Sequence, residues 1–212
     1  MVDIFETKFE GAKVEVFDNR VKKGEDVNVS AKDPALKRLH IGCGWDLNAF
    51  DTDSLDLDMS CFLLDKTGKT RMDEDFVFYN NMQALGGAVR HSGDSRTGAG
   101  DGDDEFILLD LAGIPFDIIR VLFVLSIYQA NYKEQNIGMI RNAYLRLVNA
   151  DSMNEIMRYE LKEELRDRKE GGIVIAALDR EGPKWHFRTI GEGVPNGLPE
   201  VAEMHGIIVG QS

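Results

Sequence analysis

Cysteine is scarce in this chain of 212 residues, which contains only Cys43 and Cys61. Two cysteines are too few for a disulfide framework in a chain of this length. They form no Cys-x-x-Cys pair and the four histidines are scattered, which argues against a zinc-finger type of site. We therefore expect both thiols to be buried as small apolar side chains, in a protein of the reducing cytosol.

A long apolar run is missing as well. No stretch approaches the ~18 residues that a membrane-spanning helix needs. The N-terminal segment contains Asp3, Glu6 and Glu10 and has no apolar centre, so we do not expect it to act as a signal peptide. Together these features predict a cytoplasmic protein without direct membrane insertion.

Basic residues are in the minority, with 25 Lys and Arg against 37 Asp and Glu and a formal net charge of −12. Nucleic acids and anionic membrane surfaces are bound by cationic patches, which a chain of this charge does not favour. We therefore expect no nucleic-acid partner. The excess of carboxylates suits a cation as partner, or serves solubility alone.

What the chain does contain is a series of short β-type segments separated by turn residues. Such segments at a spacing of about 8–12 residues, with few helical patterns, are typical of a β-sandwich. We predict an all-β protein with minor α content, as one β-sandwich domain over 21–212 preceded by an extension, 1–20, that packs one strand on it. Strands are expected over 13–17, 21–30 (with a turn over 23–26), 39–45 (with glycine kinks), 57–64, 76–81, 106–111, 118–128, 138–148, 155–161, 172–178 and 185–190. A helical turn is expected after 161 and a short helix from 197 to about 204.

The stretch from Gly93 to Glu105 is the most unusual part of the sequence, with four aspartates, one glutamate and four glycines. Carboxylates that close together repel one another unless water or a cation separates them. Glycine permits the positive-φ turns that aim carbonyl and carboxylate oxygens inward. A cation that takes about six to eight oxygen ligands, as calcium does, is the natural partner, although an isolated acidic loop is more often simply solvated.

A second acidic cluster supports the calcium interpretation. Asp56 and Asp58 stand at the start of segment 57–64, which we expect to pair with 76–81 as a hairpin. Folding that hairpin brings both aspartates to the same end as the two asparagines that close its second strand. The EF-hand template fails in both clusters because its required glycine is missing, so the predicted site is bipartite. The predicted ligands of one or two Ca²⁺ ions are Asp56, Asp58, Asn80, Asn81, Asp94, Asp101, Gly102, Asp103, Asp104 and Glu105.

Several long motifs occur together in one known family. They are Gly42-x-Gly44-Trp45-Asp46, Asp56-Leu57-Asp58-x-Ser60-x-Phe62-Leu63-Leu64, Asp75-Phe76-Val77-Phe78-Tyr79-Asn80-Asn81 and the acidic stretch Gly93–Glu105. On these residues the chain, from about Val21 to Val209, resembles the TerD family of tellurite-resistance and general bacterial stress proteins. The resemblance implies a cytoplasmic, calcium-binding β-sandwich that acts in stress responses and tellurium resistance. It also implies other stress and tellurite-resistance proteins as partners, including partners at the membrane.

Three classes of function stay open on the residues themselves. We favour a calcium-dependent binding or scaffold module that is not an enzyme, because no serine or cysteine stands in a recognisable nucleophile motif and we expect His91 to be a solvated loop residue. A metal-dependent, phosphoesterase-like hydrolase is one alternative, since clustered carboxylates can hold two metal ions about 4 Å apart. A small-molecule or nucleotide binder with purely structural calcium is the other.

Overall fold

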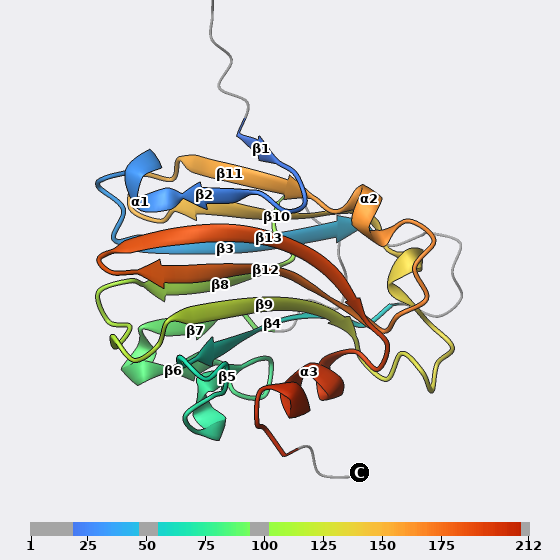
Figure 1. Cartoon of the computed structure of the whole chain (residues 1–212). Coiled ribbons are helices and arrows are strands. Elements are labelled where there is room, and N and C mark those ends of the chain that lie inside the picture. Colours follow the sequence, from blue (N-terminus) through green and yellow to red (C-terminus); the bar gives the residue numbers. More distant parts are fainter. Residues whose placement is uncertain (1–18, 47–54, 94–101, 209–212) are drawn as a thin grey trace, which may run out of the picture.

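The structure is a computed structural model that describes residues 19–46, 55–93 and 102–208, and its strands form two sheets (Figure 1). The pairings are antiparallel except that of β1 with β11. The first sheet has the order β1 (Arg20–Val21), β11 (Glu155–Glu160), β10 (Arg141–Asn149), β3 (Arg38–Asp46), β8 (Glu105–Asp110), β7 (Val89–His91), β6 (Gln83–Ala84). The second has the order β2 (Asp26–Asn28), β13 (Lys184–Val194), β12 (Gly172–Glu181), β9 (Arg120–Ile127), β4 (Leu57–Leu64), β5 (Phe76–Val77).

Strand β4 shows that the second sheet is covered on both faces, since all eight of its residues are buried. Met59 and Cys61 belong to the core that the two sheets share, whereas Phe62 and Leu64 belong to a separate apolar cluster. Val201 of α3 (Leu198–Met204) joins that second cluster, so the helix covers the outer face of the sheet. This double cover explains why β4 is a continuous apolar run instead of an alternating one. Each fully buried apolar side chain of this kind contributes about 1.5–3 kcal/mol.

Most of the expected elements are confirmed. Strand β9 lies between β12 and β4, which makes the segment predicted over 118–128 central in its sheet. The expected hairpin is present as β4 with β5, and the two expected strands β12 and β13 pair with each other. Strand β11 is followed by α2 (Lys162–Leu165), and α3 begins after Gly197. Cys43 and Cys61 are fully buried, as predicted.

Three local predictions are wrong, and one lies outside the described residues. Segment 21–30 contains the expected turn, but it ends in a helix, because Asn28 caps α1 (Val29–Lys32) by accepting a hydrogen bond from the Ala31 N–H at 2.9 Å. A 3₁₀ turn over Ile137–Met139 delays the start of β10. Strand β5 stops at Val77, since residues 78 and 81 exchange backbone hydrogen bonds in a tight turn. Segment 13–17 is not described.

The two glycines of β3 lie within the paired part of the strand. Gly42 pairs with residues of both β8 and β10, and Gly44 pairs with Tyr144. A Cβ atom on Gly42 would lie 2.0 Å from Oδ2 of Asp103, and one on Gly44 would lie 2.5 Å from the Tyr144 ring. The two glycines therefore make room for side chains that cross β3 at close range.

Candidate metal centre at the end of the sandwich

The last four residues of the acidic stretch, Gly102–Glu105, form what we call the rim segment, which lies against the end of β3. The Asp104 N–H donates to the Cys43 carbonyl at 2.9 Å, and Oδ2 of Asp104 accepts from the Trp45 N–H at 2.8 Å. The Gly102 carbonyl accepts from the Tyr144 hydroxyl at 2.9 Å. These bonds extend the pairing of β3 and β8 beyond the strand and fix the position of the segment.

The side chains of Glu105 and His91 bond the backbone of Met59 in β4, as a neighbouring strand would do. Strand β5 pairs only with Cys61 and Phe62, so the outward backbone groups of Met59 need other partners. Glu105 Oε2 accepts from the Met59 N–H at 2.8 Å, and His91 Nε2 lies 2.8 Å from the Met59 carbonyl. The first sheet thereby contacts the second through two buried polar side chains.

His91 is therefore buried, and the expectation of a solvated loop histidine is wrong. Its Nδ1 accepts from the Gly93 N–H at 2.9 Å, so the proton of the neutral ring lies on Nε2 and is donated to the Met59 carbonyl. Burial would lower the pKa of His91, but Glu105, with Oε2 3.5 Å from Nε2, and Asp58 raise it. The ring serves structure, because both its nitrogens are engaged by backbone groups.

The charge of the Asp103 carboxylate, in the rim segment, is compensated by an arginine. Its two carboxylate oxygens accept from the Arg146 guanidinium at 2.7 and 2.9 Å, and it also bonds His40 Nε2 at 2.8 Å and the Tyr144 hydroxyl at 3.0 Å. Burial would raise the pKa of Asp103, but the bonds from His40, Arg146 and Tyr144 lower it to about 2. Gly42 leaves the space in which this carboxylate sits.

Asp104 stands in the opposite electrostatic situation. Burial raises its pKa, and the charges of Asp46, Glu105 and Asp103 raise it further, against the single lowering bond from Trp45. The pKa of the Cys43 thiol is likewise raised by burial and then by the three acids of the rim segment. At both groups the charges of the neighbouring acids thus act in the same direction as burial.

The second acidic cluster lies next to this segment. Asp58 is 5% exposed and precedes the residue that Glu105 bonds, and it lines a cavity together with Asn81. Asn81 donates its side-chain N–H to the Phe76 carbonyl at 2.6 Å, and Asn80 is exposed. Asp56 is half-buried, with Oδ2 3.9 Å from Lys133 Nζ.

The structure thus brings together the two acidic segments that the sequence analysis assigned to one end of the fold. Glu105 bonds the residue after Asp58 and adds its charge to that around Asp104, while Asp103 is held by Arg146 on β10. The described carboxylates of the two segments do not place three ligand atoms within 4.8 Å of one another. Asp94 and Asp101 lie outside the described residues. The assignment of these residues as calcium ligands stays a prediction.

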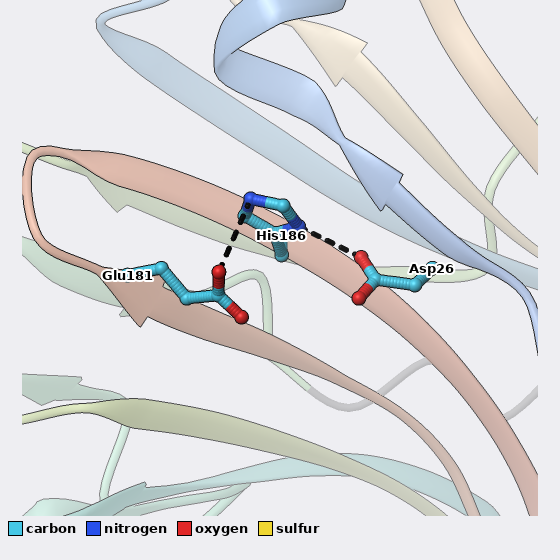
Figure 2. A group of neighbouring side chains, drawn as sticks. All are labelled: Asp26, Glu181 and His186. Atoms are coloured by element: carbon cyan, nitrogen blue, oxygen red, sulfur yellow. Dashed lines mark hydrogen bonds and ion pairs between the residues drawn. The ribbon is translucent and has the colours of Figure 1, made fainter.

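Sequence reasoning missed a different cluster, on β2, β12 and β13, in which Asp26 and Glu181 flank His186 (Figure 2). Among the residues that the structure describes, this group alone has three potential ligand atoms within 4.8 Å of one another. Arg188 bonds both carboxylates, so part of their charge is already compensated. About 160 residues separate the first strand from the other two, and no local signal could have predicted the pairing.

Fold and site together define a class: a two-sheet β-sandwich with buried carboxylates gathered at one end. A family model described as the TerD domain matches residues 18–205 of this chain. The chain therefore belongs to the TerD family.

Named relatives agree with this assignment. The tellurium resistance protein TerD of Serratia marcescens is 40% identical over 187 residues, covering 88% of this chain and 96% of that protein. General stress protein 16U of Bacillus subtilis is 40% identical over 189 residues, covering 89% and 97%. The crystal structure of a telluride resistance protein (TerD) homologue from Streptomyces coelicolor matches with a TM-score of 0.64 at 19% identity, covering 82% of this chain and 100% of that one. That likeness supports the fold.

Proposed function

We propose that this protein binds calcium at the end of the sandwich and acts, without catalysing a reaction, as a calcium-dependent binding module in a cytoplasmic stress response. The observation that carries the proposal is the approach of the two acidic segments, since Glu105 bonds the backbone of Met59 at 2.8 Å, directly after Asp58. Burial and then the charges of three neighbouring acids raise the pKa of Asp104, which is consistent with a cation there. The donor atoms there are oxygens, which suit a hard cation such as calcium. None of the helices in the described ranges is long and apolar enough to cross a membrane.

The contacts divide the predicted ligands by role. Asp58 and Asp104, with Asp94 and Asp101 of the same acidic stretch, would hold the ion. Asp103 would keep the rim segment in place through Arg146, because both its oxygens are already bonded. Glu105 would add negative charge while remaining bound to Met59.

Calorimetric titration with CaCl₂ tests the proposal. We expect saturable binding that weakens about tenfold or more in Asp58→Asn and in Asp104→Asn, since each change removes one charged ligand. Asp117→Asn is the matched control, because Asp117 is an exposed acid paired with Arg71 on another part of the surface. Saturating calcium should also raise the melting temperature. Absence of binding, or an equal loss of calcium affinity in the control, would contradict the proposed calcium site.

The names of the relatives support a role in tellurium resistance and general stress. We expect cells that lose this protein to become more sensitive to tellurite, and the Asp104→Asn variant to restore resistance less well than the wild type. Other stress and tellurite-resistance proteins would be its partners. We expect the immobilised protein to retain them in the presence of calcium and to release them when EDTA is added. If the protein hydrolyses phosphate esters and Asp104→Asn abolishes this activity, the alternative of a metal-dependent, phosphoesterase-like hydrolase is favoured instead.

A further inference from the structure

A large cavity opens on the outer face of the second sheet, beside the calcium site of the proposed function. Its volume is about 810 Å³, within the range of small-molecule sites. Ser126 and Tyr128, at the end of β9, line it together with residues of the turn after β5 and of helix α3. The helix lies along this side of the sheet (Figure 1).

Aromatic rings form a continuous series that leads from the packed interior to the mouth of this cavity. Phe62 stacks on Phe76 at 4.4 Å between centroids, and Phe76 stacks on Phe78 at 4.3 Å. Tyr79 meets Phe78 edge-on at 5.1 Å and Tyr128 at 6.4 Å. Tyr128 remains 43% exposed, so part of its ring is available to a ligand.

The charges of the cavity have one sign. Asp58, Asp73 and Glu74 line it, and none of its described lining residues is Lys, Arg or His. Just outside the lining, Lys133 Nζ lies 5.2 Å from the centre of the Tyr128 ring and 3.9 Å from a carboxylate oxygen of Asp56. An ammonium group of the protein itself thus contacts this ring close to a carboxylate, and the cavity offers a ligand the same two kinds of group.

We propose that the cavity binds an organic cation with an aromatic or aliphatic body. The charged group lies toward the carboxylates, and the apolar body packs on the aromatic series and on α3. Attraction between a cation and an aromatic face adds to the apolar contact, which discriminates a cation from a neutral molecule of the same shape. Repulsion by three carboxylates excludes an anion of similar size.

Three probes of similar size test this class: phenyltrimethylammonium, its neutral isostere tert-butylbenzene, and the anion benzenesulfonate. Binding is measured by titration of the amide signals in ¹H–¹⁵N spectra, with EDTA present throughout. We expect phenyltrimethylammonium to shift the signals of Tyr128, Asn81 and Ala202 and to bind about fivefold more tightly than tert-butylbenzene. Benzenesulfonate should not bind.

Two variants then test separately how the Tyr128 ring and the carboxylates contribute to binding. Tyr128→Leu removes an aromatic face but keeps apolar bulk, so it should weaken the cation about fivefold and change the affinity of tert-butylbenzene by less than about twofold. The double variant Asp73→Asn/Glu74→Gln should weaken the cation alone. Phe116→Leu is the control, because Phe116 is an 84% exposed ring beside Arg180 that does not line the cavity.

Equal affinity for the cation and its isostere, binding of benzenesulfonate, or no shift by any probe would each overturn the proposal. EDTA and the use of Asp73 and Glu74, which are outside the predicted calcium ligands, keep this test independent of calcium. If the protein binds calcium but not phenyltrimethylammonium, only this inference is wrong. If it binds phenyltrimethylammonium but not calcium, only the proposed function is wrong.

Discussion

Two acidic regions of this molecule have similar composition and opposite electrostatic character. Arg188 bonds Asp26 and Glu181, the two acids of the cluster in Figure 2, and also the neighbouring Asp179 at 2.6 Å. Asp179 in addition accepts from Arg120 at 2.6 and 2.8 Å. Burial would raise the pKa of Asp179, but these arginines lower it. At the rim segment one arginine serves Asp103, while the pKa of Asp104 is raised.

The comparison shows that the number of carboxylates does not by itself define a cation site. What matters is the charge that remains after the protein's own cations are paired. Around Arg188 two arginines contact three acids, whereas at the rim segment Arg146 contacts Asp103. The following predictions break one side of the comparison or the other, in decreasing order of expected effect.

The largest effect is expected from Arg146→Met. The change leaves the buried Asp103 carboxylate without its bidentate partner, which should lower the free energy of unfolding by about 3 kcal/mol. Urea denaturation measures the difference. Arg38→Met is the control, because Arg38 pairs with Asp151 at the surface and should cost less than about 1 kcal/mol. Equal losses in the two variants would show that Asp103 does not depend on Arg146.

Gly42→Ala should displace the same carboxylate by steric conflict. The added Cβ would lie 2.0 Å from Oδ2 of Asp103, so we expect a loss of about 2–3 kcal/mol by urea denaturation. In an Asp103→Ala background the conflict is absent and the loss should fall below about 1 kcal/mol. The same loss of stability in both backgrounds would show that it arises within strand β3 and not from a conflict with Asp103.

Acid should remove the stabilisation that Asp103 supplies. Its pKa is lowered from the ordinary 3.8 to about 2, so the contribution is complete above pH 4 and is lost as the pH falls toward 2. The shift corresponds to about 2 kcal/mol. Stability curves from pH 5 to pH 2 should be flatter by this amount in Asp103→Asn. Parallel curves for the two proteins would contradict the assignment.

The smallest change in stability is expected from Arg188→Met, at about 1 kcal/mol, because Arg188 is partly exposed and Asp179 keeps Arg120. The variant should instead gain weak zinc binding, since Asp26, Glu181 and His186 place three ligand atoms within 4.8 Å of one another. Calorimetry with ZnCl₂ compares it with the wild type. Zinc binding at these residues in the wild type would show that Arg188 does not block the cluster.

Much of this organisation could be predicted from the sequence. The hairpin of β4 and β5 is encoded locally by two β-type runs and a turn, and Asp58 and Asn81 line the same cavity at its end. The strand character of the residues after Asp104 was equally clear. The two-sheet architecture follows from the number and spacing of such segments.

The electrostatic partners could not be predicted. Arg146 and His40 reach Asp103 only because β10 and β8 both pair with β3 in one particular register, which no local pattern specifies. His91 was misjudged for a similar reason, since its role depends on β5 being too short to pair with Met59. Charge compensation is thus decided by strand register, and acidic composition alone overstates the number of available ligands.

The most direct test of this account is a calcium titration followed by ¹H–¹⁵N spectra of the wild-type protein. Saturable shifts should appear at the amides of Asp58, Asp104 and Trp45, while those of Asp26, Glu181 and His186 stay unchanged. Shifts centred on Asp26 and Glu181, or no shift at either region, would contradict it.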